Sequence, residues 1–174
     1  MKEKAYVGDA VKILQEQEEL NQEQLAFDLN VSPGMISHYK NNRRPMQRDV
    51  AQESLKMHDN PIYQMQVLYE FSDGLTSPVL DGDAIEQHRL AFKDFLANEA
   101  REAFQKLKDV NLLKCPTQAD KNDIEQIKQL IWELDDAEIA IANFKMILAK
   151  EYRVSLIKEK HSRQATFKAK GWVR

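Results

Sequence analysis

The stretch Leu20–Tyr39 reads LNQEQLAFDLNVSPGMISHY and decides the expected fold. It predicts two short helices joined by a tight turn. Asn21 and Gln24 have the spacing of a capping box at the start of the first helix. Asn30 follows the last turn of that helix, where a residue in the left-handed region reverses the chain. The chain therefore turns back before a second helix begins.

The second helix of this pair has two different faces. Ser32 is its expected N-cap, and Pro33 takes the first helical position, where a missing N–H costs no hydrogen bond. Helical periodicity turns Ile36 and Tyr39 back towards the first helix. The outer face carries Pro33, Gly34, Ser37 and His38, with Met35 at its border. This face is expected to enter a groove rather than a core.

The residues that hold the pair together resemble the DNA-binding helix-turn-helix of the lambda-repressor/Cro/Xre-like family. They are Gln22, Leu25-Ala26, the turn Asn30-Val31, and Ile36-Ser37. The resemblance covers roughly residues 4–72 and implies a five-helix domain whose second motif helix enters the major groove of DNA. The alternative is an ordinary helical hairpin within a core, which is a common structure.

The resemblance also implies a role for each residue that would face DNA. Gln22 would donate a hydrogen bond to a phosphate at its helix N-terminus, where the helix dipole favours an anion. The residues that would face base edges are Ser32, Pro33, Gly34, Met35, Ser37 and His38. Those that would contact the DNA backbone are Lys40, Asn41, Asn42, Arg43 and Arg44.

Two of these residues limit how bases can be read. Pro33 and Gly34 cannot form paired hydrogen bonds to a base. Specificity is therefore expected to depend on Ser37, His38, apolar contacts and DNA shape. For the arginine pair, a solvated loop is the alternative interpretation.

The charge pattern places a basic patch on an acidic chain. The net charge is −3, which is not what a simple DNA-binding domain predicts. Residues 1–72 hold eight Lys/Arg and eleven Asp/Glu, yet Lys40, Arg43, Arg44 and Arg48 follow one another with no acid among them. If the patch faces phosphates, binding should be sensitive to salt.

Helix-breaking residues divide the rest of the chain. Helices are expected at about residues 4–18 and 47–57 and again after Asn60-Pro61, which completes a domain over residues 1–72. Residues 73–83 form the expected linker, because they are rich in glycine, proline, serine and aspartate.

Residues 84–160 are expected to form an antiparallel hairpin of two long amphipathic helices. Asp83 and Glu86 are spaced as a capping box for the first, and Pro116 precedes a second of about forty residues. A lone hairpin cannot bury both apolar stripes, which favours a homodimer or tetramer over a monomer that folds back on the N-terminal domain. The expected oligomerisation residues are Phe92, Leu96, Phe104, Ile127, Ile131, Leu134, Ile141, Phe144 and Leu148.

The last segment, residues 161–174, is a basic tail that contains Phe167 and Trp172. A solvated terminus is the first interpretation. The second is an arm that contacts phosphates or docks through Trp172.

No residue pattern indicates catalysis, a metal ion or a cofactor. The histidines lack ligand spacing, and the single cysteine, Cys115, has no CxxC partner. There is no glycine-rich phosphate loop and no apolar run of about 18 residues that would span a membrane. One cysteine also fits a reducing cytoplasm. An enzyme is therefore not expected.

Together these features predict an all-α transcriptional regulator of the cytoplasm, of the phage or prophage repressor type. Its N-terminal helix-turn-helix domain would bind operator sites in double-stranded DNA. Its C-terminal helices would form the oligomer and receive an inducer or antirepressor protein. Two alternatives remain open: an antitoxin-like autorepressor whose C-terminal helices bind a protein partner, and a protein-interaction adaptor whose helix-turn-helix is only structural.

Overall fold

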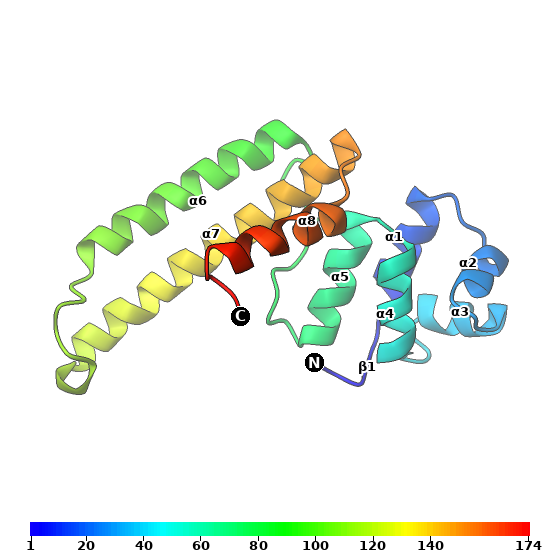
Figure 1. The fold of residues 1–174 in the computed structure, drawn as a ribbon, viewed down its shortest axis with the longest axis horizontal. Coiled ribbons are helices and arrows are strands. Elements are labelled where there is room, and N and C mark those ends of the chain that lie inside the picture. The colour runs from blue at the N-terminus through cyan, green and yellow to red at the C-terminus, as the bar shows by residue number, and fades with distance from the viewer. The chain divides into compact units, whose positions relative to one another are not determined.

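A computed structural model describes residues 1–174, and most of them are helical (Figure 1). This agrees with the all-α class that the sequence predicts. No helix is long and apolar enough to cross a membrane. The α-helices are α1 (Gly8–Gln17), α2 (Gln22–Asp28), α3 (Pro33–Lys40), α4 (Arg48–Met57), α5 (Pro61–Ser72), α6 (Arg89–Asp109), α7 (Lys121–Tyr152) and α8 (Leu156–Ala169).

Two short strands and a 3-10 turn complete the list of elements. The strands β1 (Lys4–Ala5) and β2 (Met46–Gln47) pair antiparallel, and η1 (Pro116–Gln118) precedes α7. The sequence predicts a helix from residue 4, whereas α1 begins at Gly8 because β1 is held in the strand pair. Strands of two residues are too short to show an alternating pattern, so the sequence gives no sign of them.

The chain divides into two compact units. The first comprises Met1–Val79 together with Leu148–Arg174, and the second comprises Leu80–Ile147. The sequence predicts one uninterrupted helix of about forty residues, but the backbone breaks at Arg153, which has a φ of 55°. Ser155 then caps α8 by accepting a hydrogen bond from the Lys158 N–H at 3.2 Å. The residues from Leu148 onward, which include the last turn of α7, group with the N-terminal segments.

The core of the first unit is formed by α1 to α5 with β2. Leu14, Leu25 and Ile36 are fully buried and join the first three helices. Met46 of β2 and Tyr63 of α5 are also fully buried. The Tyr63 hydroxyl donates to the Ser54 Oγ at 2.6 Å, and burial raises the pKa of Tyr63 to about 12. The apolar positions that the helical periodicity identifies at Leu25 and Ile36 are therefore confirmed as core.

The second unit contains α6 and α7 as far as Ile147, and the two helices lie side by side and run in opposite directions (Figure 1). Lys106 of α6 donates to the side-chain oxygens of Gln126 and Gln129 of α7, at 2.8 and 2.6 Å. The apolar side chains buried on these two helices within the unit are Phe92, Ala103, Leu130, Ala137, Ala140, Met146 and Ile147.

The start of α6 differs from the predicted one. The helix begins at Arg89, with His88 as N-cap accepting from the Leu90 N–H at 3.3 Å, and not at the expected Asp83 cap. The preceding residues are held in a loop, because the Gln87 side chain donates to the Leu80 carbonyl at 2.7 Å. The Leu80 N–H donates in turn to the Asn143 Oδ1 at 2.9 Å.

Candidate nucleic-acid interface

Local capping fixes the start of α2 and the turn that follows it. The Asn21 Oδ1 accepts from the Gln24 N–H, and the Gln24 Oε1 accepts from the Asn21 N–H, both at 2.8 Å. The capping box predicted from the sequence is therefore confirmed. Asn30 has a φ of 50°, the left-handed conformation expected of the turn residue.

The helix α3 buries one face and exposes the other. The Ser32 Oγ accepts from the Met35 N–H at 3.2 Å, with Pro33 at the first helical position, as predicted. Ile36 and Tyr39 are buried against the core. The outer positions Ser32, Pro33 and Gly34 are exposed, and Met35, Ser37 and His38 are half-buried.

Two features of this outer face bear on what it can contact. A Cβ on Gly34 would have only the Ser32 Oγ as a neighbour, at 3.9 Å, so the backbone here is open to close approach. The Nδ1 atom of His38 is buried and has no hydrogen-bond partner. Buried polar atoms without a partner are uncommon in folded proteins and invite a functional explanation.

Gln22 joins the N-termini of the two motif helices. Its Nε2 donates to the Pro33 carbonyl at 2.8 Å. A second hydrogen on Nε2 stays available, so the phosphate contact implied by the resemblance is chemically compatible with this bond. The two residues lie 11 positions apart, and no local pattern in the sequence indicates that they are bonded.

The loop after α3 is ordered by its own polar groups. The Asn41 Nδ2 donates to the Ser37 carbonyl at 2.8 Å. The Asn42 Oδ1 accepts from the Gly8 N–H at 2.9 Å, which satisfies a free N–H at the start of α1. Gly8 has no room for a side chain, because a Cβ there would lie 2.6 Å from the Asn42 Oδ1. Both asparagines thus have structural partners in addition to the DNA contacts that the resemblance implies.

The same loop presents its arginines through backbone hydrogen bonds. The N–H groups of Arg43 and Arg44 both donate to the His38 carbonyl, at 2.9 and 3.3 Å. Both side chains are exposed. The end of α3 therefore holds the backbone of the basic loop, and the guanidinium groups of Arg43 and Arg44 are left in solvent.

Within residues 1–72, unpaired positive charge is concentrated at this place. Four of the eight Lys/Arg in residues 1–72 form ion pairs: Lys2 with Asp73, Lys12 with Asp9, Arg48 with Glu3, and Lys56 with Glu53. Those without an ion pair are Lys4, Lys40, Arg43 and Arg44. Three of the four unpaired cations thus belong to α3 and its loop, whereas Arg48 of the predicted basic patch is neutralised.

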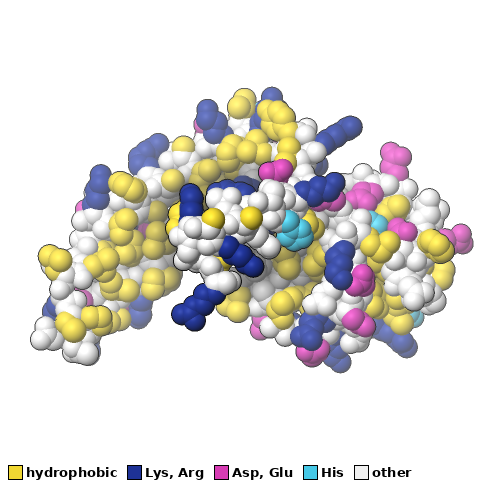
Figure 2. Space-filling view, in the orientation of Figure 1, with side chains coloured by type: hydrophobic (Ala, Val, Ile, Leu, Met, Phe, Trp, Pro, Cys, Tyr) yellow, Lys and Arg dark blue, Asp and Glu magenta, His cyan; other side chains and the backbone are white.

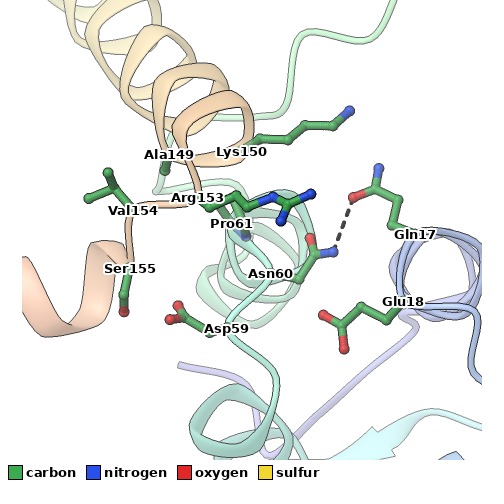
Figure 3. Close-up of a pocket in the computed structure, with 10 residues that line it drawn as sticks. All are labelled: Gln17, Glu18, Asp59, Asn60, Pro61, Ala149, Lys150, Arg153, Val154 and Ser155. Carbon is green, nitrogen blue, oxygen red and sulfur yellow. Dashed lines mark hydrogen bonds between the residues drawn. The ribbon is translucent and has the colours of Figure 1, made fainter.

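An open pocket of about 380 Å³ lies elsewhere in the first unit (Figure 3). The sequence gives no sign of it, since its lining comes from the end of α1, the start of α5 and residues 149–155. In Figure 3 the Asn60 Nδ2 donates to the Gln17 Oε1, at 3.0 Å. The lining combines Glu18 and Asp59 with Lys150 and Arg153, so it favours neither an anion nor a cation.

Among the remaining titratable groups, the buried His58 lies between two carboxylates, with its Nδ1 3.1 Å from the Glu18 Oε2 and its Nε2 3.8 Å from the Asp28 Oδ2. No three His, Cys, Asp or Glu side chains are grouped so that they could hold a metal ion. Cys115 is exposed, and hydrogen bonding from Thr117 lowers the pKa of its thiol.

The nine residues predicted for oligomerisation fall into three groups. Phe92 is buried within the second unit. Four are exposed: Phe104, Ile131, Leu134 and Ile141. The other four, Leu96, Ile127, Phe144 and Leu148, are half-buried. Phe92 is therefore not available to a partner, whereas each of the other eight exposes at least part of its side chain.

Comparisons with protein-family models, with curated proteins and with solved structures found no match to this chain.

Proposed function

We propose that this chain is a DNA-binding transcriptional regulator of the lambda-repressor/Cro/Xre-like type, in which α1 to α5 form the helix-turn-helix domain and α3 enters the major groove. One observation carries the proposal. Lys40, Arg43 and Arg44 are left without ion pairs directly beside the exposed face of α3, on a chain whose net charge is −3.

The shape of α3 supports this role. The major groove, about 12 Å wide, admits an α-helix. The small residues at the N-terminal end of α3, above all Gly34, allow its backbone to approach the base edges closely. Ser37 and His38 supply the polar side chains for base contacts. Pro33 and Met35 supply apolar surface suited to a thymine methyl group.

The cations after α3 would provide affinity rather than specificity. Phosphate contacts position a protein on the duplex but carry no direct sequence information. Lys40, Arg43 and Arg44 suit this role because no carboxylate of the chain competes for them. Gln22 would add a neutral donor at the N-terminus of α2, where the helix dipole favours an anion.

The second unit would bring two copies of α3 to one operator. Two-fold symmetric regulators bind half-sites about 34 Å apart, one turn of DNA. Doubling the contacts would raise the overall affinity of a domain that has few polar base readers. Repression would follow from occlusion of the polymerase.

Selection of binding sites from random duplex DNA with the full-length protein tests the proposal. A DNA-binding regulator should enrich one sequence, and a two-fold symmetric protein should enrich a palindrome. A pool that stays at its input composition after repeated rounds at low salt would count against the proposed function.

A further inference from the structure

The helix α7 carries a row of exposed apolar side chains that nothing in the chain covers. Ile124, Ile131, Leu134 and Ile141 are 46%, 57%, 48% and 43% exposed. They lie along the flank of α7 beside the buried positions Leu130, Ala137 and Ala140. In Figure 2, hydrophobic side chains are visible over the part of the molecule that holds α6 and α7.

The row has the spacing of a coiled-coil seam. Ile124, Ile131, Glu138 and Lys145 repeat every seven residues, and each is followed three residues later by Ile127, Leu134, Ile141 or Leu148. These two series correspond to the a and d positions of a heptad repeat, which mark a face that packs against another helix. The helix α6 does not occupy this seam, since four of its apolar members are exposed.

From this exposure and spacing we propose that α7 pairs with α7 of a second copy in an antiparallel coiled coil. The coiled coil is centred between Trp132 and Glu133. In this register Ile131 faces Leu134 of the other copy, and Ile124 faces Ile141. The coiled coil itself does not depend on the proposed function. Only its role, which is to join two DNA-binding domains, rests on that function.

Charge selects the antiparallel direction. In a parallel pair, each Glu138 would meet Glu138 and each Lys145 would meet Lys145, and like charges at an interface are costly. In the antiparallel pair, Glu138 lies beside Lys128 of the other copy, and Lys145 lies beside Asp120. Glu138 and Lys145 form no ion pair within their own chain. Their proposed partners do, Lys128 with Glu125 at 3.7 Å and Asp120 with Lys114 at 3.1 Å, so each partner would share its charge with the other copy.

The size of the surface sets the expected strength. From Ile124 to Ile141 the seam is about 26 Å long at 1.5 Å per residue. Phe104 and Leu107 of α6 are 61% and 42% exposed and lie on the adjoining flank, which widens the apolar surface to two helices. At about 10 Å per helix, each copy buries on the order of 500 Å², at the lower limit of specific interfaces. The pair should therefore dissociate reversibly as the protein is diluted.

Sedimentation velocity of the full-length protein, without DNA, measures this association. Wild-type protein should shift from monomer to dimer over about 1 to 300 µM. Ile131→Asp should remain monomeric at every concentration. The matched control is Trp132→Asp, which removes a 61% exposed apolar side chain from the neighbouring position, about 100° around the helix, and should dimerise like the wild type.

Disulfide trapping tests the direction and the register. In a Cys115→Ser background, Ile124→Cys and Ile141→Cys are oxidised separately and as a mixture. Antiparallel pairing places like positions about 26 Å apart, so only the mixture should form a covalent dimer. A covalent dimer of either variant alone would show parallel pairing and overturn the proposal.

A wild-type monomer throughout the concentration range would also overturn the proposal, as would equal losses of dimer in Ile131→Asp and Trp132→Asp. None of these measurements includes DNA. If Ile131→Asp is monomeric but still binds a half-site, the proposed function stands whatever the outcome for the coiled coil.

Discussion

Removing the two loop arginines should weaken DNA binding in proportion to the phosphates they neutralise. If Lys40, Arg43 and Arg44 each neutralise one phosphate, log K falls with log salt at a slope of about −2.7 per chain. Between 50 and 200 mM salt, the wild type should then lose about 40-fold in affinity per chain. Arg43→Ala with Arg44→Ala leaves one contact, so the slope should fall to about −0.9 and the loss to about 3.5-fold.

Fluorescence anisotropy with a labelled duplex, repeated at several salt concentrations, measures both slopes. Lys93→Ala with Lys121→Ala is the matched control, because it removes the same charge from exposed positions of the second unit that belong to neither proposed interface. That control should keep the wild-type slope. The arginine variant should lose the same factor of affinity for a scrambled duplex as for the selected site, because phosphate contacts are independent of sequence. An unchanged slope in the arginine variant, or an equal change in the lysine control, would refute the reasoning.

Four further substitutions test other parts of the structure and of the proposed function. Gly8→Ala pushes a methyl group against the Asn42 side chain and should lower the free energy of unfolding by about 1–3 kcal/mol in urea titrations. Gly34→Ala, in open space, should leave stability within about 1 kcal/mol but weaken DNA binding, and normal binding by this variant would argue against close approach of α3. Burial raises the pKa of Tyr63 to about 12 from an ordinary 10, so stability present below pH 10 is lost as the pH rises towards 12. At pH 11 this loss should be about 1.4 kcal/mol and should be missing in Tyr63→Phe, so a variant with the same pH dependence as the wild type would exclude Tyr63 as its cause. His38→Ala should reduce the ratio of affinities for selected and scrambled DNA, and a constant ratio would remove His38 from the set of base readers.

Features encoded by neighbouring residues could be predicted from the sequence. The capping box at Asn21, the left-handed Asn30 and the Ser32 cap each depend on partners within about four positions along the chain. Such interactions survive in almost any tertiary context. For that reason the positions of α2 and α3, and the outer face of α3, follow from local chemistry alone.

Features that depend on distant residues could not be predicted. Asn42 meets Gly8 across 34 positions, and Leu80 meets Asn143 across 63. The first contact gives a structural partner to Asn42, which the resemblance places on the DNA backbone. The second helps to hold the loop before α6. No short pattern in the sequence reports them.

On α7 apolar residues lie on two adjacent flanks, and their periodicity does not show which flank faces α6. The small residues Ala137 and Ala140 are buried. The larger Ile131 and Leu134 are left exposed. Periodicity identifies apolar positions, but the choice between adjacent stripes depends on how side-chain volumes fit across the interface.

The most direct test of the central claim is chemical cross-linking from α3 to a selected operator. In the Cys115→Ser background, Ser37→Cys places a thiol on the outer face of α3. The duplex carries a tethered thiol on a base, in either the major or the minor groove. A disulfide that forms only with the major-groove tether within the half-site is the predicted result. Equal yields from both grooves, or no cross-link at a site that the protein binds, would contradict the placement of α3 on DNA.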